Sequence, residues 1–79
     1  MVKHKQVYLS HFGYGEQDMV QSEVSGKRAE HIHHLIFRSH GGKDEIDNLM
    51  ALTAEEHEQA HTDPLFNTEL MRIHKEYLR

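Results

Sequence analysis

Cysteine is absent from the chain of 79 residues. Disulfides and thiolate zinc sites are therefore both excluded. A domain of this size buries only a modest core and usually needs a disulfide, a metal or a partner chain for stability. The sequence leaves two of these sources open: a metal held by nitrogen and oxygen ligands, or oligomerisation.

The chain also lacks an excess of positive charge and any long hydrophobic run. Its formal net charge is -4 at pH 7, whereas a protein that binds DNA by simple electrostatic attraction is basic overall. An enzyme acting on phosphodiesters is still possible, because a bound divalent cation and a few basic residues can supply positive charge locally. No apolar stretch resembles a membrane span or a signal peptide, so we expect no membrane association and a cytoplasmic protein.

Histidine, in contrast, is abundant. The chain has nine histidines, where average usage gives about two in this length. They are dispersed and so do not form a tag. Histidine is the commonest metal ligand and the commonest general base near neutral pH. Four of them have no spacing that requires a role, and we expect these at the surface: His4, His11, His40 and His74.

The N-terminal half reads as short elements separated by turns. A helix is predicted over residues 2–12, ended by the glycines of 13–15. Two short strands are predicted at 19–24 and 29–35, joined by a tight turn at 25–28. A loop containing two adjacent glycines follows from 37 to about 48, and the apolar run 49–52 is either a strand or the approach to a helix.

Two helix starts are marked in the C-terminal half. Thr53 and Glu56 form a capping-box pattern, which predicts a helix running to about His61. Asp63 followed by Pro64 predicts a second start. The last helix carries one apolar stripe at spacings of four, three and four, which covers either the core, as we favour, or a second subunit: Phe66, Leu70, Ile73 and Tyr77.

The spacing of three histidines suggests a metal site. His57 and His61 are four residues apart on a predicted helix, which places them on one face with Cβ atoms about 5–6 Å apart. Two histidines spaced in this way, with no other ligand, usually just lie on a solvent-exposed helix face. A third ligand from elsewhere would make a catalytic metal site with open coordination positions. His33 is the candidate third ligand. Adjacent strand residues point to opposite faces, so His34 would be free to act as a base.

The segment Glu30–His61, "EHIHHLIFRSHGGKDEIDNLMALTAEEHEQAH", resembles the HNH nuclease motif, also called the ββα-metal or His-Me finger. The upstream pieces "FGY" and "SGKRA" fit bacterial and phage members more loosely. The resemblance implies an α+β fold with a small ββα-metal core and flanking N- and C-terminal helices. It further implies a single HNH nuclease domain over 1–79, with the core motif at about 29–62, a helix and hairpin at 1–28 and a C-terminal helix at 64–78.

The same resemblance assigns roles to individual residues. In such enzymes the first histidine of the pair binds metal and the second activates water, which makes His33 a ligand and His34 the general base. The asparagine bonds across the loop and orients that base, a role carried here by Asn48. His57 and His61 are then further ligands, as in the three-histidine sites of nuclease bacteriocins.

The implied reaction is hydrolysis of DNA phosphodiester bonds, by nicking or double-strand cleavage, with a single metal ion and a histidine base. The expected cofactor is one divalent ion: zinc, manganese, magnesium, nickel or cobalt. Arg38, Lys27 and Arg28 are candidate contacts to DNA phosphates. A homodimer would let one small site per subunit cut both strands. The expected setting is a bacterial or phage-infected cell.

Departures from the family pattern keep other interpretations open. Many relatives hold a structural zinc with four cysteines, whose positions match Ser22, Ser25, Thr53 and Glu56 here, so no such zinc is possible. Relatives often have an acidic residue at His31 and a proline at Phe37. One alternative is therefore a non-catalytic DNA-binding or scaffold module that kept the fold, and another is a metal-binding protein without nuclease activity. His34 separates them, because catalysis requires it and metal binding does not.

Overall fold

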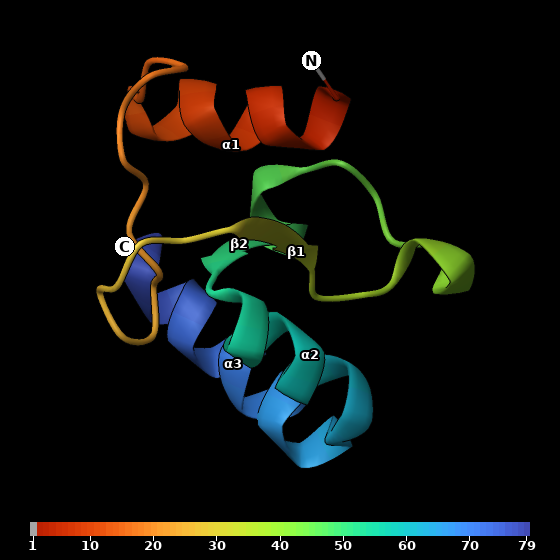
Figure 1. The fold of residues 1–79 in the computed structure, drawn as a ribbon. Coiled ribbons are helices and arrows are strands. Elements are labelled where there is room, and N and C mark those ends of the chain that lie inside the picture. The colour runs from red at the N-terminus through yellow and green to blue at the C-terminus, as the bar shows by residue number, and fades with distance from the viewer. Residues whose placement is uncertain (1) are drawn as a thin grey trace.

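A computed structural model describes residues 2–79, so Met1, the first residue of the predicted N-terminal segment, lies outside the described residues. Within these described residues, three α-helices and two strands follow one another, with two short 3-10 turns in the segment between the strands (Figure 1). This mixture confirms the expected α+β class. The elements are α1 (Lys3–Phe12), β1 (His31–His34), η1 (Arg38–His40), η2 (Ile46–Asn48), β2 (Leu49–Leu52), α2 (Ala54–Thr62) and α3 (Pro64–Tyr77).

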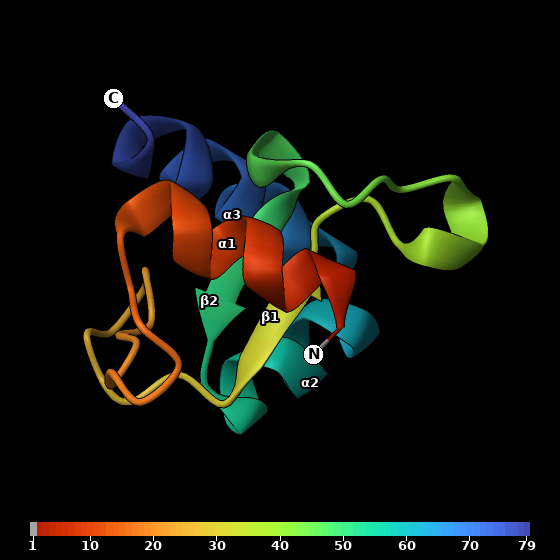
Figure 2. The same cartoon turned by 90° about the horizontal axis from the view of Figure 1, so that it is seen from above.

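The two antiparallel strands form a thin sheet between helices. Helix α1 covers one face, and α2 and α3 cover the other (Figure 1). Seen from above, α1 crosses the strands, and the loop carrying η1 extends away from them (Figure 2). No helix in the described part of the chain has both the length and the apolar character needed to span a membrane.

Strand β2 contributes to two separate hydrophobic clusters because side chains alternate along a strand. Met50 and Leu52 pack with Leu70 on the α2 and α3 face. Leu49 and Ala51 pack with Tyr8 on the α1 face. All four β2 residues are fully buried, which explains why their sequence shows a continuous apolar run rather than an alternating one.

The strand register decides where the two adjacent histidines lie. His33 pairs with Met50 and His34 pairs with Leu49. His33 therefore faces α2 and α3, whereas His34 faces α1. The predicted alternation of this pair is confirmed.

The predicted strand at 19–24 is wrong, and the strand at 29–35 is shorter than predicted, at His31–His34. Gln21 makes an isolated bridge with Arg28. Beyond it the chain turns, with the Ser22 amide donating to the Lys27 carbonyl at 2.7 Å and the Gly26 amide to the Ser22 carbonyl at 3.0 Å. The Glu23 amide donates to the Ala51 carbonyl of β2 at 3.1 Å, but the turn at Ser22 prevents a longer ladder, and the Ser22 and Glu23 side chains bond to Glu56 and His74.

The helix boundaries follow the predicted signals. The predicted helix spans residues 2–12, and α1 runs from Lys3 to Phe12. The capping box of Thr53 and Glu56 is present at the start of α2. The Asp63 side chain accepts from two amides at the start of α3, and Pro64 occupies the first turn.

The apolar stripe of α3 covers the core, as favoured. Leu70 is fully buried, and Phe66 and Ile73 pack against the same cluster. Tyr77, at the end of the stripe, is 42% exposed and contacts the ring of Phe12.

The four positions that match the family's zinc cysteines form a hydrogen-bonded cluster. The Ser22 hydroxyl donates to Glu56 Oε1 at 2.5 Å, and the Thr53 amide donates to the same oxygen at 2.9 Å. Burial works against ionisation of Glu56, but hydrogen bonds from Ser22, Thr53 and Ser25 outweigh it and hold the pKa of this carboxyl below its usual value. Side-chain hydrogen bonds thus join the N-terminal turn to α2 at these positions.

Candidate metal centre and general base

Three histidines from two elements converge on one point. His33 comes from β1, and His57 and His61 come from successive turns of α2. Each offers one ring nitrogen, and these nitrogens all lie within 4.8 Å of one another. The structure therefore brings together all three of the predicted ligands.

The protonation of His33 can be assigned from its neighbours. The side-chain amide of Asn67, on α3, donates to the Leu35 carbonyl at 2.9 Å, so its oxygen faces the His33 ring. His33 Nε2 lies 2.8 Å from that oxygen and must carry the proton. In the neutral ring Nδ1 then has a lone pair, and it lies 3.1 Å from His57 Nδ1.

Burial favours the neutral form of two of these rings, those of His33 and His57. It lowers the pKa of His33, and the other histidines nearby add to the effect. Burial and repulsion from His31 and His33 lower the pKa of His57 to about 4. Neutral imidazoles are the form that binds a metal, and one nitrogen of each ring converges on the same point, so the residues fit a divalent transition ion.

Two further rings stack on the candidate ligands. His31 stacks on His57 with a centroid distance of 4.4 Å and an interplanar angle of 14°. Phe37 stacks on His61 at 4.6 Å and 14°. Two of the positions at which the chain departs from the family pattern, His31 and Phe37, therefore contact the candidate ligands directly and restrict the orientation of two of them.

His34 lies on the other face of β1 and has a carboxylate partner. Its Nε2 is 2.7 Å from Asp44 Oδ1. The hydrogen bond from His34 holds the pKa of Asp44 below its usual value, so the carboxylate is ionised and can only accept. In the neutral ring His34 Nε2 therefore carries the proton, and Nδ1 has the lone pair that a general base needs.

Asn48 closes the loop that presents Asp44. Its side-chain oxygen accepts from the Ile36 amide at 2.7 Å, and its side-chain amide donates to the carbonyls of Ile36 and Lys43 at 3.1 and 3.0 Å. Asn48 thus contacts the loop backbone, and Asp44 is the residue bonded to the His34 ring. We infer that any influence of Asn48 on the base passes through this loop.

The candidate phosphate contacts lie at two ends of the molecule. Arg38 lines a hollow of about 300 Å³ together with Lys3, Lys43 and Asp44. Lys27 and Arg28 follow the turn that precedes β1, at the opposite end of the sheet from the η1 loop (Figures 1 and 2). The structure therefore brings Arg38 close to the partner of His34 but does not bring Lys27 or Arg28 there.

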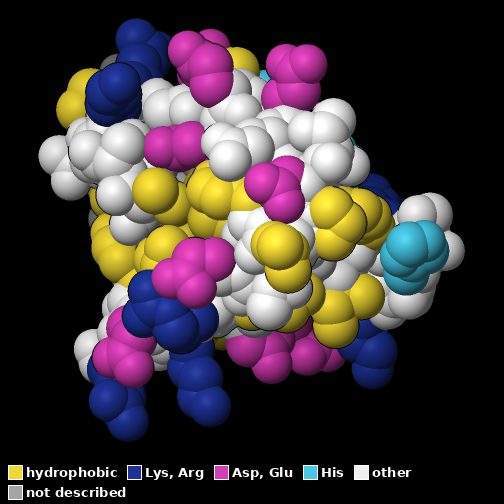
Figure 3. All heavy atoms as spheres, turned by 90° about the horizontal axis from the view of Figure 1, so that it is seen from below, with side chains coloured by type: hydrophobic (Ala, Val, Ile, Leu, Met, Phe, Trp, Pro, Cys, Tyr) yellow, Lys and Arg dark blue, Asp and Glu magenta, His cyan; other side chains and the backbone are white. Residues whose placement is uncertain are grey.

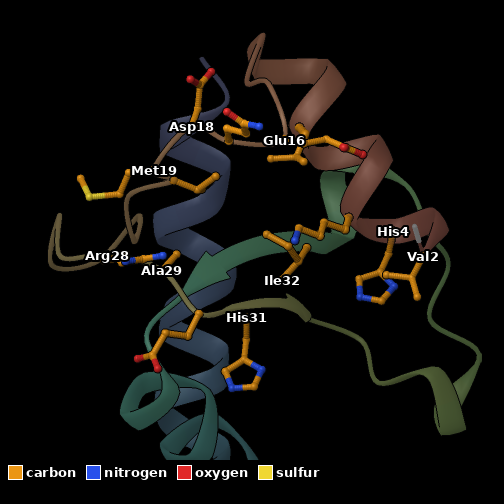
Figure 4. A pocket seen from close by; sticks show the side chains of 14 residues that line it. Val2, His4, Glu16, Asp18, Met19, Arg28, Ala29, His31 and Ile32 are labelled. Atoms are coloured by element: carbon orange, nitrogen blue, oxygen red, sulfur yellow. The ribbon is translucent and has the colours of Figure 1, made fainter.

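Arg28 lines a different pocket, of about 610 Å³, between α1, the segment before β1 and β1 itself. In Figure 4, Arg28 and His4 lie at opposite ends of this pocket. Acidic residues share the lining, including Glu16, Asp18 and Glu30. Because of this mixed charge, the pocket is a poor match for a run of phosphates.

The expectation that four histidines lie at the surface is correct for His11 and His40, which are exposed. It is wrong for His74, which is 1% exposed. His74 Nδ1 lies 2.7 Å from Glu23 Oε1, and Nε2 donates to the Ile46 carbonyl at 2.7 Å. His4 is half-buried and lies beside His34, with ring centroids 4.8 Å apart.

Sequence reasoning missed Asn67, Asp44 and Lys3. Asn67 lies on a different helix from every ligand, and no spacing links it to His33. Asp44 stands in a loop beside another acidic residue, Glu45, and the sequence does not show which of the two reaches the base.

Comparison with known proteins agrees with this geometry. A family model described as HNH endonuclease matches residues 21–63, a little more than half of the chain. This range includes every candidate ligand, His34, Asp44 and Asn48. No curated protein and no solved structure matches the chain.

Proposed function

Because this chain belongs to the HNH endonuclease family, we propose that it hydrolyses DNA phosphodiester bonds with one divalent metal ion and a histidine general base. The observation that carries the proposal is the pair of sites that meet on β1: three converging imidazoles on one face and a carboxylate-bound imidazole on the other. Its proposed setting is the cytoplasm of a bacterial or phage-infected cell.

His33, His57 and His61 would hold the ion. A divalent ion supplies Lewis-acid stabilisation of the negative charge that develops on phosphate oxygens. Three imidazoles suit zinc, nickel, cobalt or manganese better than magnesium, which prefers oxygen ligands. The hydrogen bond from His33 to Asn67 fixes which nitrogen faces the ion, and such support typically strengthens metal binding.

His34 would act as the base through Nδ1. It takes a proton from water, the water oxygen forms a bond to phosphorus, and the bond from phosphorus to the 3′ oxygen breaks. Asp44 holds the proton on Nε2 and stabilises the imidazolium that forms, as the carboxylate does in a catalytic triad. Asn48 would keep the loop in the conformation that presents Asp44.

Arg38 would contact the scissile or an adjacent phosphate, since it shares a hollow with Asp44. Lys3 and Lys43 line the same hollow and add positive charge to it. Lys27 would contact a phosphate farther along the duplex, whereas Arg28 lines a pocket with acidic residues and is the weaker candidate. Phosphate contacts of this kind position DNA without reading its sequence.

The test is cleavage of supercoiled plasmid by purified protein with Mn²⁺ or Mg²⁺, with and without EDTA. We expect metal-dependent nicking, and we expect the rate to fall about 10²–10⁴-fold in His34→Ala. His40→Ala is the matched control, because this exposed histidine lies in the loop after β1 and should retain the wild-type rate. Circular dichroism would verify that each variant is folded.

Wild-type protein that binds metal but cleaves DNA with none of several divalent ions would contradict the proposal. The non-catalytic DNA-binding or scaffold module would then be the better account. Equal rates for His34→Ala and wild type would contradict the assignment of the base while leaving the nuclease activity in place.

We also propose that the protein acts as a homodimer, so that two sites can cut both strands. Hydrophobic side chains are exposed across the middle of the face seen from below, with charged side chains around them (Figure 3). On α3, Leu65 is 82% and Met71 is 39% exposed. Light scattering that gives the mass of a single chain at working concentration would reject the dimer.

A further inference from the structure

A second cluster of metal-binding side chains lies on the α1 face of the sheet. His4, His34 and Asp44 each offer one ligand atom, and these atoms all lie within 4.8 Å of one another. The three residues come from α1, from the end of β1 and from the loop before η2. Neither His4 nor Asp44 is among the ligands predicted from the sequence.

The cluster is held in place but reachable from solvent. The side chains of His34 and Asp44 are 11% and 18% exposed. His4 projects from α1 toward β1, whereas His31 lies on the opposite side of that strand (Figure 4). Among the described residues, the ring nitrogens of His4 make no hydrogen bond. This imidazole is therefore free to bind a metal ion.

We propose that His4, His34 and Asp44 bind a second divalent transition ion, which removes the general base from catalysis. Two imidazoles and one carboxylate are a donor set that binds zinc, cobalt and related ions and leaves further coordination positions open. The inhibitory part of this inference rests on the proposed function. The binding site itself does not.

The ion and the shared proton would exclude each other. His34 Nε2 and Asp44 Oδ1 are 2.7 Å apart, a hydrogen-bond distance. Two ligands at about 2.0–2.1 Å from a tetrahedral ion lie about 3.3 Å apart, so the pair would open by roughly half an ångström. With an ion bound to Nε2, the neutral His34 ring carries its proton on Nδ1. It can then no longer take a proton from water.

The second site lies on the opposite face of the sheet from the first and is built from different elements. His33 and His34 share a strand but face opposite sides of the sheet. The first site depends on α2, and the second depends on α1 and the loop. Variants can therefore remove either site separately.

The test is the number of ions bound per chain. Zn²⁺ titrations by calorimetry and Co²⁺ titrations by visible absorption should give two sites in the wild-type protein. His4→Ala should bind one ion and should lose the second set of cobalt bands. Asp44→Ala, which removes the ligand in the loop, should give the same result. His57→Ala should lose the other site. His11→Ala, an exposed histidine of the same helix, should still bind two.

A single site in the wild-type protein, or two sites in both folded His4→Ala and Asp44→Ala, would overturn the proposal. Plasmid cleavage gives a separate readout. Activity of the wild type should fall when zinc exceeds one equivalent, and this fall, measured against each variant's own activity at one equivalent, should be absent in His4→Ala. Two bound ions without any nuclease activity would leave the site standing and remove the proposed function instead.

Discussion

His33 and His34 are neighbours in the chain but have different partners. His33 faces α2 and is bonded to Asn67, whereas His34 faces the other side and is bonded to Asp44. In both cases a neighbouring oxygen holds the proton on Nε2 and leaves Nδ1 with a lone pair. One residue step along a strand is sufficient to give the proposed ligand and the proposed base different partners.

Replacing Asp44 by Asn should slow cleavage without weakening metal binding at the site formed by His33, His57 and His61. An amide at this position can donate to His34 and favour the wrong tautomer. Because Asp44 is partly exposed, we expect kcat to fall about 10-fold to 100-fold, less than for a buried triad carboxylate. Plasmid cleavage at saturating metal would measure this, with Glu45→Gln as the control. An unchanged kcat would show that Asp44 does not hold the base.

Replacing Asn67 by Ala should weaken metal binding. His33 Nε2 would lose its acceptor, the ring would be free to change tautomer, and affinity should fall about 10- to 100-fold. Asn67→Asp keeps an acceptor oxygen and should lose less. Calorimetric titration with Zn²⁺ would measure both, and Thr68→Ala provides an exposed control on the same helix. Equal affinities for wild type and Asn67→Ala would contradict the assigned tautomer.

At the scale of elements, the loop between the strands depends on two glycines for different reasons. Gly41 has φ +86°, a conformation that side chains rarely adopt. A Cβ on Gly42 would lie 1.7 Å from the Ile36 carbonyl oxygen, so the backbone of the loop would have to move. The adjacent glycines thus provide one positive φ and one close approach.

Gly41→Ala should therefore destabilise the fold by about 1–2 kcal/mol through the left-handed backbone alone. Gly42→Ala should cost more, because it displaces the loop that carries Asp44 and is closed by Asn48. It should also reduce cleavage more than Gly41→Ala does. Urea denaturation and plasmid cleavage of the two variants would check the order, and the reverse order would contradict this account.

The first turn of α2 is joined to the N-terminal turn through one carboxylate. Glu56 accepts from the Ser22 hydroxyl and from the Thr53 amide. Glu56→Ala removes both bonds, and we expect a loss of about 2 kcal/mol in the free energy of unfolding. Glu58→Ala, on the exposed side of α2, should stay within about 0.5 kcal/mol of wild type. Urea denaturation would measure the difference, and equal losses would contradict a special role for Glu56.

At the scale of the whole molecule, one buried polar network joins the layers. The Tyr8 hydroxyl of α1 donates to Glu23 at 2.6 Å, and the same carboxylate accepts from His74 of α3. His74 also donates to the Ile46 carbonyl just before β2. Such networks are costly to break because each partner would be left unsatisfied in the core.

This network should make stability depend on pH. Burial works against protonation of His74, but the bonds to Glu23 and Ile46, with the charge of Asp47, outweigh it and raise the pKa above 6.5. A raised pKa in the folded state contributes stability that is complete below 6.5 and is lost as the pH rises through the folded value.

We therefore expect the difference in unfolding free energy between wild type and His74→Gln to shrink as the pH rises above 6.5. Urea denaturation over a pH series in EDTA would measure it. The lowered pKa of His57 acts in the opposite sense, destabilising the metal-free protein as the pH falls from 6.5 toward about 4. Because His57 titrates in both proteins, comparing them isolates His74. A difference independent of pH would contradict the raised pKa.

The sequence by itself determined the features that depend on local spacing. Helix starts follow from Thr53 and Asp63, because capping involves residues two or three positions apart. The opposite directions of His33 and His34, and the shared face of His57 and His61, follow from the periods of a strand and a helix. The order and spacing of the family's motif residues can likewise be read from the sequence alone.

Only the tertiary structure decided which distant side chains meet. Asn67 reaches His33, Asp44 and His4 reach His34, and Glu23 reaches His74 because separate elements pack on the two faces of one small sheet. The predicted strand at 19–24 does not form because the chain turns at Ser22, where the Ser22 side chain bonds to α2 and the Glu23 side chain bonds to α3. Contacts between distant residues depend on packing, and no local pattern in the sequence encodes them.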